Sequence, residues 1–534
     1  MQNKKMKNAM QGAFILTLAS LVAKVLSAIY RIPLQNLVGN TGFYVYQQIY
    51  PIYGIGITFA LSGFPVFVSK LIAEQETTAS KVRVAQRAFV ILSGISVVIV
   101  AALMGGAPFI AQAMGDGGLT PIIRCVSLMF LFMPFLAVGR GYYQGIFQMG
   151  PTARSQIMEQ VVRVGVIIVV AYMAAKQNWN VYRMGTWAMS GAVVAALVST
   201  LYFGRLFWTK LFTRQPHTPV VQPKIPSYKQ LGRRFWVEGG TICLFAAIII
   251  LLQLIDSFTV KNGLVAGGDS DRAAKSLKGV YDRAQPLVQL GLVIATSFST
   301  TLLPSLTKAV QKRNQTEFKR SAQSMLHICL AISVAACAGM VVLLPQINQV
   351  LFGNTEGTRA IQIYVLAIIL TALITTYNSV LQSLNVFQPA IIAFGAGLLV
   401  KLGLNQLAVT HYGIEGASWV TVLSLAVILG CLFVQVSDAL RESLRLDWRF
   451  LTKLVITSFG MILAVHFVQL GLLRLFVGAG RLELGALILI IVGIGVLVFG
   501  GIAIGLRLFT IREWLTIPYG KRLLKKLEKI VSKK

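Results

Sequence analysis

Long apolar stretches recur along almost the whole chain, and they restrict the fold more than any other feature of the sequence. Each is about 20 residues or longer, enough for a helix to cross a hydrocarbon layer roughly 30 Å thick. Inside such a layer every backbone polar group needs a partner within the protein, and a helix supplies these partners by itself. The chain is 56% hydrophobic and 13% charged, which excludes a soluble protein of 534 residues. We predict an all-α polytopic membrane protein.

Fourteen of these stretches qualify as transmembrane helices. They cover residues 11–34, 44–68, 88–106, 121–146, 152–174, 185–204, 236–259, 282–306, 322–346, 360–383, 388–408, 415–437, 454–473 and 484–506. A basic tail follows the last of them.

Two of the stretches, 235 residues apart, are diverged copies of one another. The matches are Tyr46, Pro51, Gly56, Ala60, Ser62 and Leu71 with Tyr281, Pro286, Gly291, Ala295, Ser297 and Leu306. A further set, at an offset of 238, joins Gln144, Pro151 and Arg163 to Gln382, Pro389 and Lys401. The copies lie six spans apart and therefore share one orientation in the membrane. Two parallel-repeat six-helix lobes related by an axis along the membrane normal are expected, with two C-terminal helices outside the repeat.

This repeat predicts five regions. They are an N-lobe at 1–204 (spans 1–6), a basic cytoplasmic linker at 205–235, a C-lobe at 236–440 (spans 7–12), spans 13–14 within 441–506, and a tail at 507–534. The tail alternates Leu and Ile with Lys and Arg, which is typical of an amphipathic helix on an anionic cytoplasmic leaflet.

The distribution of basic residues predicts the orientation. With the N-terminus inside, cytoplasmic segments hold 32 of the 49 Lys and Arg residues, external segments hold 9, and spans hold 8. This bias places both termini in the cytoplasm. It also explains the net charge of +31 without a nucleic-acid partner, which we do not expect. The external segment 260–281 carries four of the nine external basic residues and is interpreted as a polar external cap.

Eight cationic and five acidic residues lie within predicted spans or at their ends. A charge in the hydrocarbon core is costly, so such residues usually face a cavity or a partner. Four lie in the first turn of a span and are expected to reach the interface: Arg124, Arg154, Asp282 and Glu415. Lys24 and Lys401 lie in the middle of their spans. The excess of cations favours an anionic substrate, and arginine suits phosphate because it can bind it with two parallel hydrogen bonds.

Two alternatives remain open for the acidic residues. Glu159 and Arg163 are four residues apart, so they would either pair on one helix face or contact substrate. Asp256 would pair with Arg283 or with Arg31 near the outer side of the membrane.

No signature of bond-making chemistry is visible in the sequence. There is no phosphate-binding loop, no nucleophile elbow, and no His or Cys pair at metal-ligand spacing. We therefore predict a transporter rather than an enzyme. No cofactor is expected, and coupling to the membrane potential or to a monovalent ion stays open. A membrane glycosyltransferase would need an external catalytic carboxylate, for which Asp269 and Asp271 are among the few candidates.

Two motifs resemble a known superfamily. They are the run from Lys24 to Leu34 with Gly42 to Pro51, and the run from Tyr281 to Arg283 with Leu303 to Lys308. Together with the turn from Gly413 to Ala417, they resemble the multidrug/oligosaccharidyl-lipid/polysaccharide (MOP) flippase superfamily. The resemblance is strongest to MurJ-like lipid II flippases and to stage V sporulation protein B-like polysaccharide exporters of Gram-positive bacteria.

The resemblance implies two six-helix lobes around a cationic cavity, with the two terminal helices forming a groove for a lipid tail. Lys24 and Arg31 match the basic residues of the first helix of the family, and Arg283 matches the arginine of its eighth helix. Gram-negative members also carry an essential arginine on the second helix, but residues 54–59 of this chain contain no charge. The substrate-binding residues predicted from charge and resemblance together are Lys24, Arg31, Glu159, Arg163, Asp256, Arg283 and Lys401.

The function expected from these observations is a flippase of the bacterial cytoplasmic membrane. It would move an undecaprenyl-pyrophosphate-linked cell-wall precursor, with lipid II as the first candidate, from the inner to the outer leaflet by alternating access. Its partners would be this polyprenyl-pyrophosphate-linked glycan and membrane lipids, and it would act as a monomer. Alternatives are an exporter of another polyprenyl-linked polysaccharide unit and, disfavoured by the sign of the charge, a cation-coupled multidrug antiporter.

Overall fold

The structure is a computed structural model, and its regular elements are helical, with no strand in the part of the chain that it describes. The described residues are 2–212, 226–293, 306, 309–310, 312–384, 386–436, 438–475 and 480–516. The prediction of an all-α polytopic membrane protein is confirmed.

The chain divides into two compact units. One contains Met1–Pro286 and Leu398–Thr421, and the other contains Leu287–Gly397 and Val422–Lys534. The lobe boundaries inferred from the repeat stay a prediction.

The helices before residue 287 all belong to the first unit. They are α1 (Gln2–Ile29), α2 (Arg31–Thr58), α3 (Phe64–Ala73), α4 (Thr78–Ala113), α5 (Thr120–Ser127), α6 (Met133–Gly145), α7 (Met149–Lys176), α8 (Val181–Tyr202), α9 (Gly204–Leu206), α10 (Tyr228–Arg234), α11 (Gly240–Ala266) and α12 (Asp271–Asp282). The later helices are α14 (Gln315–Phe352), α15 (Thr358–Val365), α16 (Ala367–Ser383), α17 (Gln388–Gln435), α18 (Asp438–Ser443), α19 (Trp448–Leu475), α20 (Arg481–Gly505) and α21 (Ile511–Thr516).

Eleven stretches of the described residues are long and apolar enough to cross a membrane. Two of them, Leu18–Ala73 and Gln388–Gln435, contain 56 and 48 residues. At about 1.5 Å per residue each is long enough to cross twice. The predicted eighth span, 282–306, runs into residues outside the described part. Thirteen of the fourteen predicted spans overlap these eleven stretches, and the eighth stays a prediction.

Both double-length stretches turn at a glycine. Gly39 has φ 69° and Gly413 has φ 56°, the left-handed region that other residues adopt only with strain. The second turn is also tight, because a Cβ at Gly416 would lie 2.2 Å from the backbone oxygen of Ala408. Small residues at these turns therefore let two spans follow one another without a long loop.

A packing contact recurs in the two halves of the repeat. A Cβ added to Gly56 would lie 2.9 Å from the ring of Phe130 in the first unit. A Cβ added to Gly291 would lie 2.5 Å from Ile368 in the second unit. Gly56 and Gly291 are offset by 235 residues, and Phe130 and Ile368 by 238, the two offsets found in the sequence. The duplication therefore preserves a side-chain contact as well as a sequence pattern.

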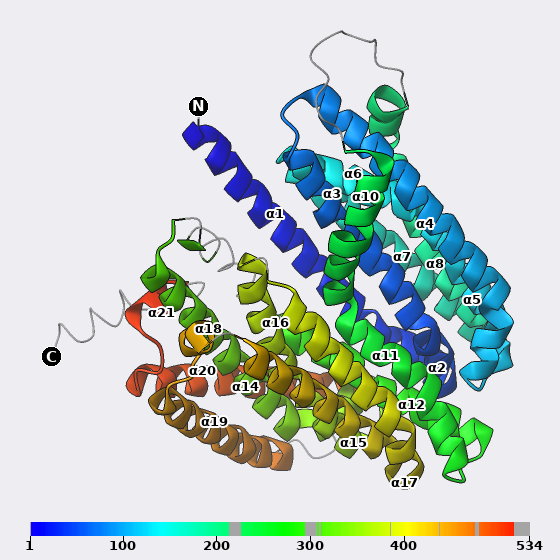
Figure 1. Ribbon diagram of the computed structural model, residues 1–534. Coiled ribbons are helices and arrows are strands. Elements are labelled where there is room, and N and C mark those ends of the chain that lie inside the picture. Colours follow the sequence, from blue (N-terminus) through cyan, green and yellow to red (C-terminus); the bar gives the residue numbers. More distant parts are fainter. Residues whose placement is uncertain are drawn as a thin grey trace. The chain divides into compact units, whose positions relative to one another are not determined.

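In the first unit, α2 lies at the centre of the packing. It contacts α7, α8, α11 and α12, while α1 packs along α7 (Figure 1). The approach of α12 is close, since a Cβ on Gly279 would lie 2.2 Å from the backbone oxygen of Asn40. This arrangement brings residues from both halves of the repeat together around α2.

In the second unit, α19 and α20 pack against each other and against α14. Their shared core contains Leu343 of α14, Met461 and Val465 of α19, and Ile491 of α20. Of the predicted amphipathic tail, 507–534, only residues up to 516 are described, and they include α21. Glu513 of α21 bonds to His327 of α14 at 2.9 Å, so this part of the tail is attached to the helix bundle. Residues 213–225 of the predicted linker lie outside the described part.

The segment 260–281, which was predicted to be a polar external cap, is mostly helical. It consists of the end of α11, a short turn and most of α12. Lys261 and Lys278 are both buried instead of reaching solvent. Helix packing, which spacing alone does not reveal, buries these two lysines, and the interpretation of the segment as a polar external cap stays a prediction.

Candidate functional site

Buried charges are concentrated in the first unit. Six of the predicted substrate-binding residues are buried there: Arg31, Glu159, Arg163, Asp256, Arg283 and Lys401. The seventh, Lys24 on α1, is exposed and has no hydrogen bond or ion pair to any described residue. The structure separates the buried residues into groups with different partners.

Arg31 and Arg163 belong to one group, which we call the arginine–tyrosine cluster, together with Tyr30, Tyr46, Tyr50 and Tyr53. Tyr30 lies between α1 and α2, Arg31 begins α2, and the other tyrosines follow on α2 at spacings of four and three residues, which place them on one face. Arg163 reaches the cluster from α7.

Aromatic rings surround both guanidinium groups. Arg31 lies 4.1 Å from the ring centroid of Tyr50, and Arg163 lies 5.0 Å from that of Tyr30 and 4.7 Å from that of Tyr53. The hydroxyls of Tyr30 and Tyr46 are 2.8 Å apart. Rings hold a cation by their negative faces without neutralising its charge.

The remaining contacts of Arg163 are also with neutral groups. It donates to Gln160 at 2.7 Å, to Ser27 at 3.2 Å and to Tyr30 at 3.4 Å. Three buried donors of the cluster, Nε of Arg31, Nε of Arg163 and the hydroxyl of Tyr53, have no hydrogen-bond partner among the described residues. The cluster therefore combines two positive charges with unused donors, which is the chemistry that recognises an anion.

Glu159 pairs with a different arginine from the one expected. Its carboxylate accepts a hydrogen bond from Arg140 of α6, and both side chains are buried. Arg140 also donates to Ser155 at 3.0 Å and to the backbone oxygen of Ala60 at 3.0 Å. The suggested pairing of Glu159 with Arg163 is thus wrong in this structure, because α6 presents a closer guanidinium.

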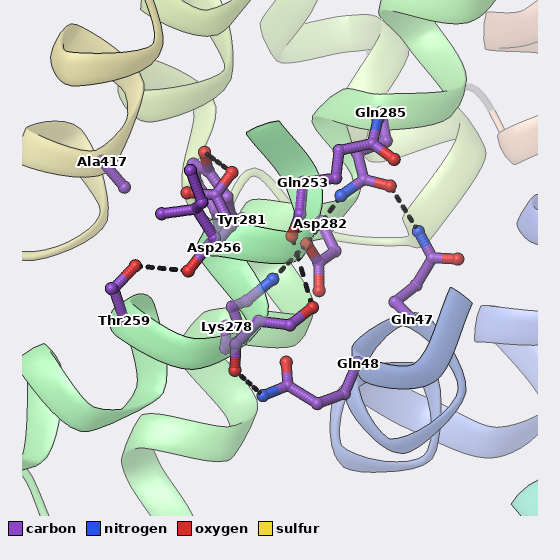
Figure 2. A network of polar contacts seen from close by, with 12 residues as sticks. Gln47, Gln48, Gln253, Asp256, Thr259, Lys278, Tyr281, Asp282, Gln285 and Ala417 are labelled. Carbon is purple, nitrogen blue, oxygen red and sulfur yellow. Dashed lines mark hydrogen bonds and ion pairs between the residues drawn. The ribbon is translucent and has the colours of Figure 1, made fainter. Parts of the chain in front are cut away.

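Asp256 of α11 lies in a second group, which we call the lysine site. Its Oδ1 is 2.7 Å from Nζ of Lys401, and it also receives hydrogen bonds from Tyr281 at 3.0 Å and Asn405 at 2.9 Å. Figure 2 shows Asp256 and Tyr281 beside Ala417. The expected pairing of Asp256 with Arg283 or Arg31 is wrong, since Lys401 of α17 occupies that position.

Arg283 lies against α2, on both sides of its break at Gly39. It donates to Oδ1 of Asn40 at 2.7 Å, and with the amide of Gln35 reoriented its Nε lies 2.6 Å from that oxygen. Two repeat-related segments, α2 and the end of α12, are joined by these contacts.

The neighbouring Asp282 does not reach the membrane interface as expected. It is fully buried and pairs with Lys278 at 2.5 Å. Gln285 donates to the same carboxylate at 3.1 Å and accepts from Gln47 of α2 at 3.0 Å (Figure 2). The expectation failed because α12 supplies a buried counterion one turn before Asp282.

Sequence reasoning missed the tyrosines of the arginine–tyrosine cluster. A signal was available, since Tyr46 is one of the repeat-matched residues and Tyr46, Tyr50 and Tyr53 share one helix face. Among the described residues no three His, Cys, Asp or Glu side chains come close enough to hold a metal ion. The expectation that no cofactor is needed stays a prediction.

A third group, the external cluster, lies at the end of the first unit predicted to face outside. Asp116 accepts from Tyr44 at 3.2 Å and Tyr182 at 2.9 Å, and lies 3.2 Å from Lys275. Asp271 pairs with Lys261 at 2.6 Å and with Lys275 at 2.8 Å. Hydrogen bonds from Lys261 and then Lys275 lower the pKa of Asp271.

This lowered pKa predicts a pH-dependent contribution to stability. The contribution of Asp271 should be present above its unfolded pKa of about 4 and be lost as the pH falls through the lower folded pKa. Because Asp271 is 59% exposed, the contribution should be at most ~1 kcal/mol. Asp271→Asn should thus melt slightly below wild type at neutral pH, and the gap should close in acid. Asp269→Asn, which removes an acid with no ion pair among the described residues, should show no gap at either pH.

The chain is similar to several known proteins. Residues 9–310 match the family described as polysaccharide biosynthesis protein. The chain is 36% identical to the uncharacterized membrane protein YabM of Bacillus subtilis (strain 168) over 521 residues, which is 96% of each chain. It is 26% identical to the lipid II flippase MurJ of the same organism over 489 residues, 86% of this chain and 88% of that protein.

A solved structure shares the fold. The lipid II flippase MurJ in an inward closed conformation superposes with a TM-score of 0.68, covering 92% of this chain and 99% of that one at 13% identity. The apolar helices and this likeness establish an integral membrane protein with a transporter fold. The chain belongs to the polysaccharide biosynthesis protein family, and it has the fold of a transporter of the MOP superfamily.

Proposed function

We propose that this protein is a flippase that moves an undecaprenyl-pyrophosphate-linked cell-wall precursor, with lipid II as the first candidate, from the inner to the outer leaflet by alternating access. It would carry out this movement without making or breaking a covalent bond. The substrate would present a pyrophosphate, a glycan headgroup and a long prenyl chain, and the protein needs a means of handling each.

The observation that carries the proposal is the charge of the arginine–tyrosine cluster. Arg31 and Arg163 are each 1% exposed and have only neutral partners among the described residues. A buried charge without a counterion is costly, so it is normally retained for a function. A pyrophosphate would supply both the negative charge and the acceptor oxygens that the unpaired donors lack. Tyr30 is the only residue between α1 and α2, so a change of bend there would admit the substrate.

The other cations of the first unit are less suited to this role. Arg140 and Lys401 are each paired with a buried carboxylate, so their charges are already neutralised. Lys278 is matched in the same way by Asp282. Arg31 and Arg163 are therefore the buried cations to which we assign phosphate binding, with Arg283 and the exposed Lys24 as further candidates.

The prenyl chain would follow α19 and α20, the two helices outside the repeat. They present long apolar side chains away from the packed core, including Phe459 and Phe467 of α19 and Leu489 and Val496 of α20. The similarity to the lipid II flippase MurJ, which extends over 86% of this chain, supports a lipid-linked substrate.

The protein would lie in the bacterial cytoplasmic membrane with both termini inside. Cysteine replacing Lys229 of α10 should be shielded from a membrane-impermeant thiol reagent in intact cells, while cysteine replacing Asp269 should react. The prediction rests on the distribution of basic residues. Reaction at position 229 from outside would reverse the proposed orientation. Permeabilised cells, in which both positions should react, provide the control.

Complementation tests the function directly. A bacterial strain depleted of its own lipid II flippase should grow when this chain is expressed and should fail with an Arg163→Met variant present at the same level in the membrane. A surface assay for lipid II should follow the same order. Rescue of a strain that lacks the exporter of another polyprenyl-linked unit, without rescue of the first strain, would favour the alternative polysaccharide exporter. Drug resistance without either rescue would favour an antiporter.

A further inference from the structure

The lysine site has the form of a monovalent-cation site whose occupant is a side chain. Nζ of Lys401 is fully buried and surrounded by oxygen: Oδ1 of Asp256 at 2.7 Å, Oγ1 of Thr421 at 2.5 Å and the backbone oxygen of Ala417 at 3.3 Å. A lysine ammonium has three N–H donors and no acceptor. Each donor therefore meets one oxygen, and the ammonium is fully satisfied.

These oxygens come from two segments, and the ammonium that joins them comes from a third. Asp256 lies on α11, Lys401 precedes the Gly413 break of α17, and Ala417 and Thr421 follow it. A carboxylate, a hydroxyl and a backbone carbonyl next to a broken helix are the ligands with which transporters bind coupling cations. Carbonyl oxygens likewise replace the hydration shell of a monovalent ion in channels.

The amide of Asn405 contacts the carboxylate of the site. Asn405 donates to Asp256 at 2.9 Å and to Thr259 at 2.6 Å, but its own Oδ1 is buried with no donor among the described residues. Tyr281 donates to the second oxygen of Asp256 at 3.0 Å. If the ammonium were removed, a carboxylate, a hydroxyl and a carbonyl would face one another.

We propose that Lys401 serves as a tethered cation, so that this protein binds no mobile Na⁺ or K⁺ at the lysine site and needs neither ion there for its conformational cycle. A buried carboxylate requires a positive partner. Here the partner is covalently attached and cannot dissociate into either compartment. Removing the ammonium while keeping the carboxylate should create a site for a monovalent cation.

The first test measures thermal unfolding of the purified full-length protein in NaCl, KCl and choline chloride at equal ionic strength. Wild type should melt at one temperature in all three salts. Lys401→Asn should melt lower in choline chloride and should regain a few degrees, saturably, in NaCl or KCl, because a ligand that binds only the folded state stabilises it. Asp256→Asn combined with Lys401→Asn should lose this response, because the carboxylate that would bind the cation is gone.

Every outcome bears on the proposal independently of transport. Saturable stabilisation of wild type by Na⁺ or K⁺ that disappears in Asp256→Asn would overturn it. Lys401→Ala serves as a second variant if Lys401→Asn does not fold. Failure of both variants to fold or to respond in either salt would also contradict the proposal, because a mobile cation would then be unable to replace the ammonium. Since no flipping is measured, these results stand whether or not the proposed substrate is correct.

Discussion

Replacing Arg163 with methionine should lower the rate of flipping by about 10- to 100-fold, because each hydrogen bond to a charged group contributes roughly 1.5–3 kcal/mol. The protein should nevertheless stay folded. The partners of Arg163 among the described residues are Tyr30, Tyr53, Ser27 and Gln160, so its removal leaves no buried carboxylate without a counterion. The expected loss of stability is that of cation–π contacts, about 0.5–2 kcal/mol. Arg31→Met should behave in the same way.

Two variants make this test specific. Arg154→Met changes an exposed arginine on the same helix, α7, and should flip substrate at the wild-type rate. Arg163→Lys should recover only part of the activity, because lysine keeps the charge but cannot offer two parallel donors. Normal flipping by both Arg31→Met and Arg163→Met would refute phosphate binding by the arginine–tyrosine cluster. Equal losses of protein and of activity would indicate a structural role instead.

The fold class followed from the sequence because the lipid bilayer imposes strict rules. A run of about 20 apolar residues must form a helix there, whatever its neighbours do. The offsets of 235 and 238 relate Tyr46 to Tyr281 and Arg163 to Lys401, respectively, from sequence alone. The second sharp turn was expected, since Gly413 lies between two predicted spans, whereas Gly39 was not singled out from the sequence.

The partners of the buried charges could not be predicted in the same way. Which carboxylate meets which cation depends on the rotation of each helix about its axis, and apolar helices with residues buried on several faces give little periodic signal for it. Asp256 and Lys401 are thus joined across 145 residues of sequence, and Glu159 selects Arg140 over Arg163, which lies on its own helix. Spacing along one helix finds only local pairs.

Residues at matching positions in the two halves of the repeat have different roles. Arg163 and Lys401 are repeat-related cations, and the repeat-related tyrosines Tyr46 and Tyr281 lie in their respective groups. The second copy contains Asp256, which neutralises its lysine. In the first copy, Arg163 has no carboxylate partner among the described residues. After duplication and divergence, the second half would thus supply a neutral structural connection. The first half would supply a positive binding site.

Replacing Arg140 or Glu159 should have the opposite effect to replacing Arg163, because it should lower the stability of the protein more than the rate of flipping. Either Arg140→Met or Glu159→Gln should destabilise the protein by about 3–5 kcal/mol, because each leaves one buried group without its partner. Arg140 also connects α6 to α7 through Ser155 and to the π-helical turn Phe59–Gly63 through Ala60. The melting temperature and the amount of protein in the membrane should both fall in the single variants, and flipping should fall only in proportion to the amount.

The double variant Arg140→Met with Glu159→Met decides between a structural and a substrate-binding role for Glu159. A buried ion pair replaced by apolar side chains of similar volume is often as stable as the original, so the double variant should recover most of the lost stability. Flipping per folded molecule should recover with it, since neither residue would contact the pyrophosphate. A double variant that is stable but inactive would instead indicate that Glu159 binds substrate. The contrast with Arg163, whose removal should lower the rate of flipping strongly and the stability by only about 0.5–2 kcal/mol, would then disappear.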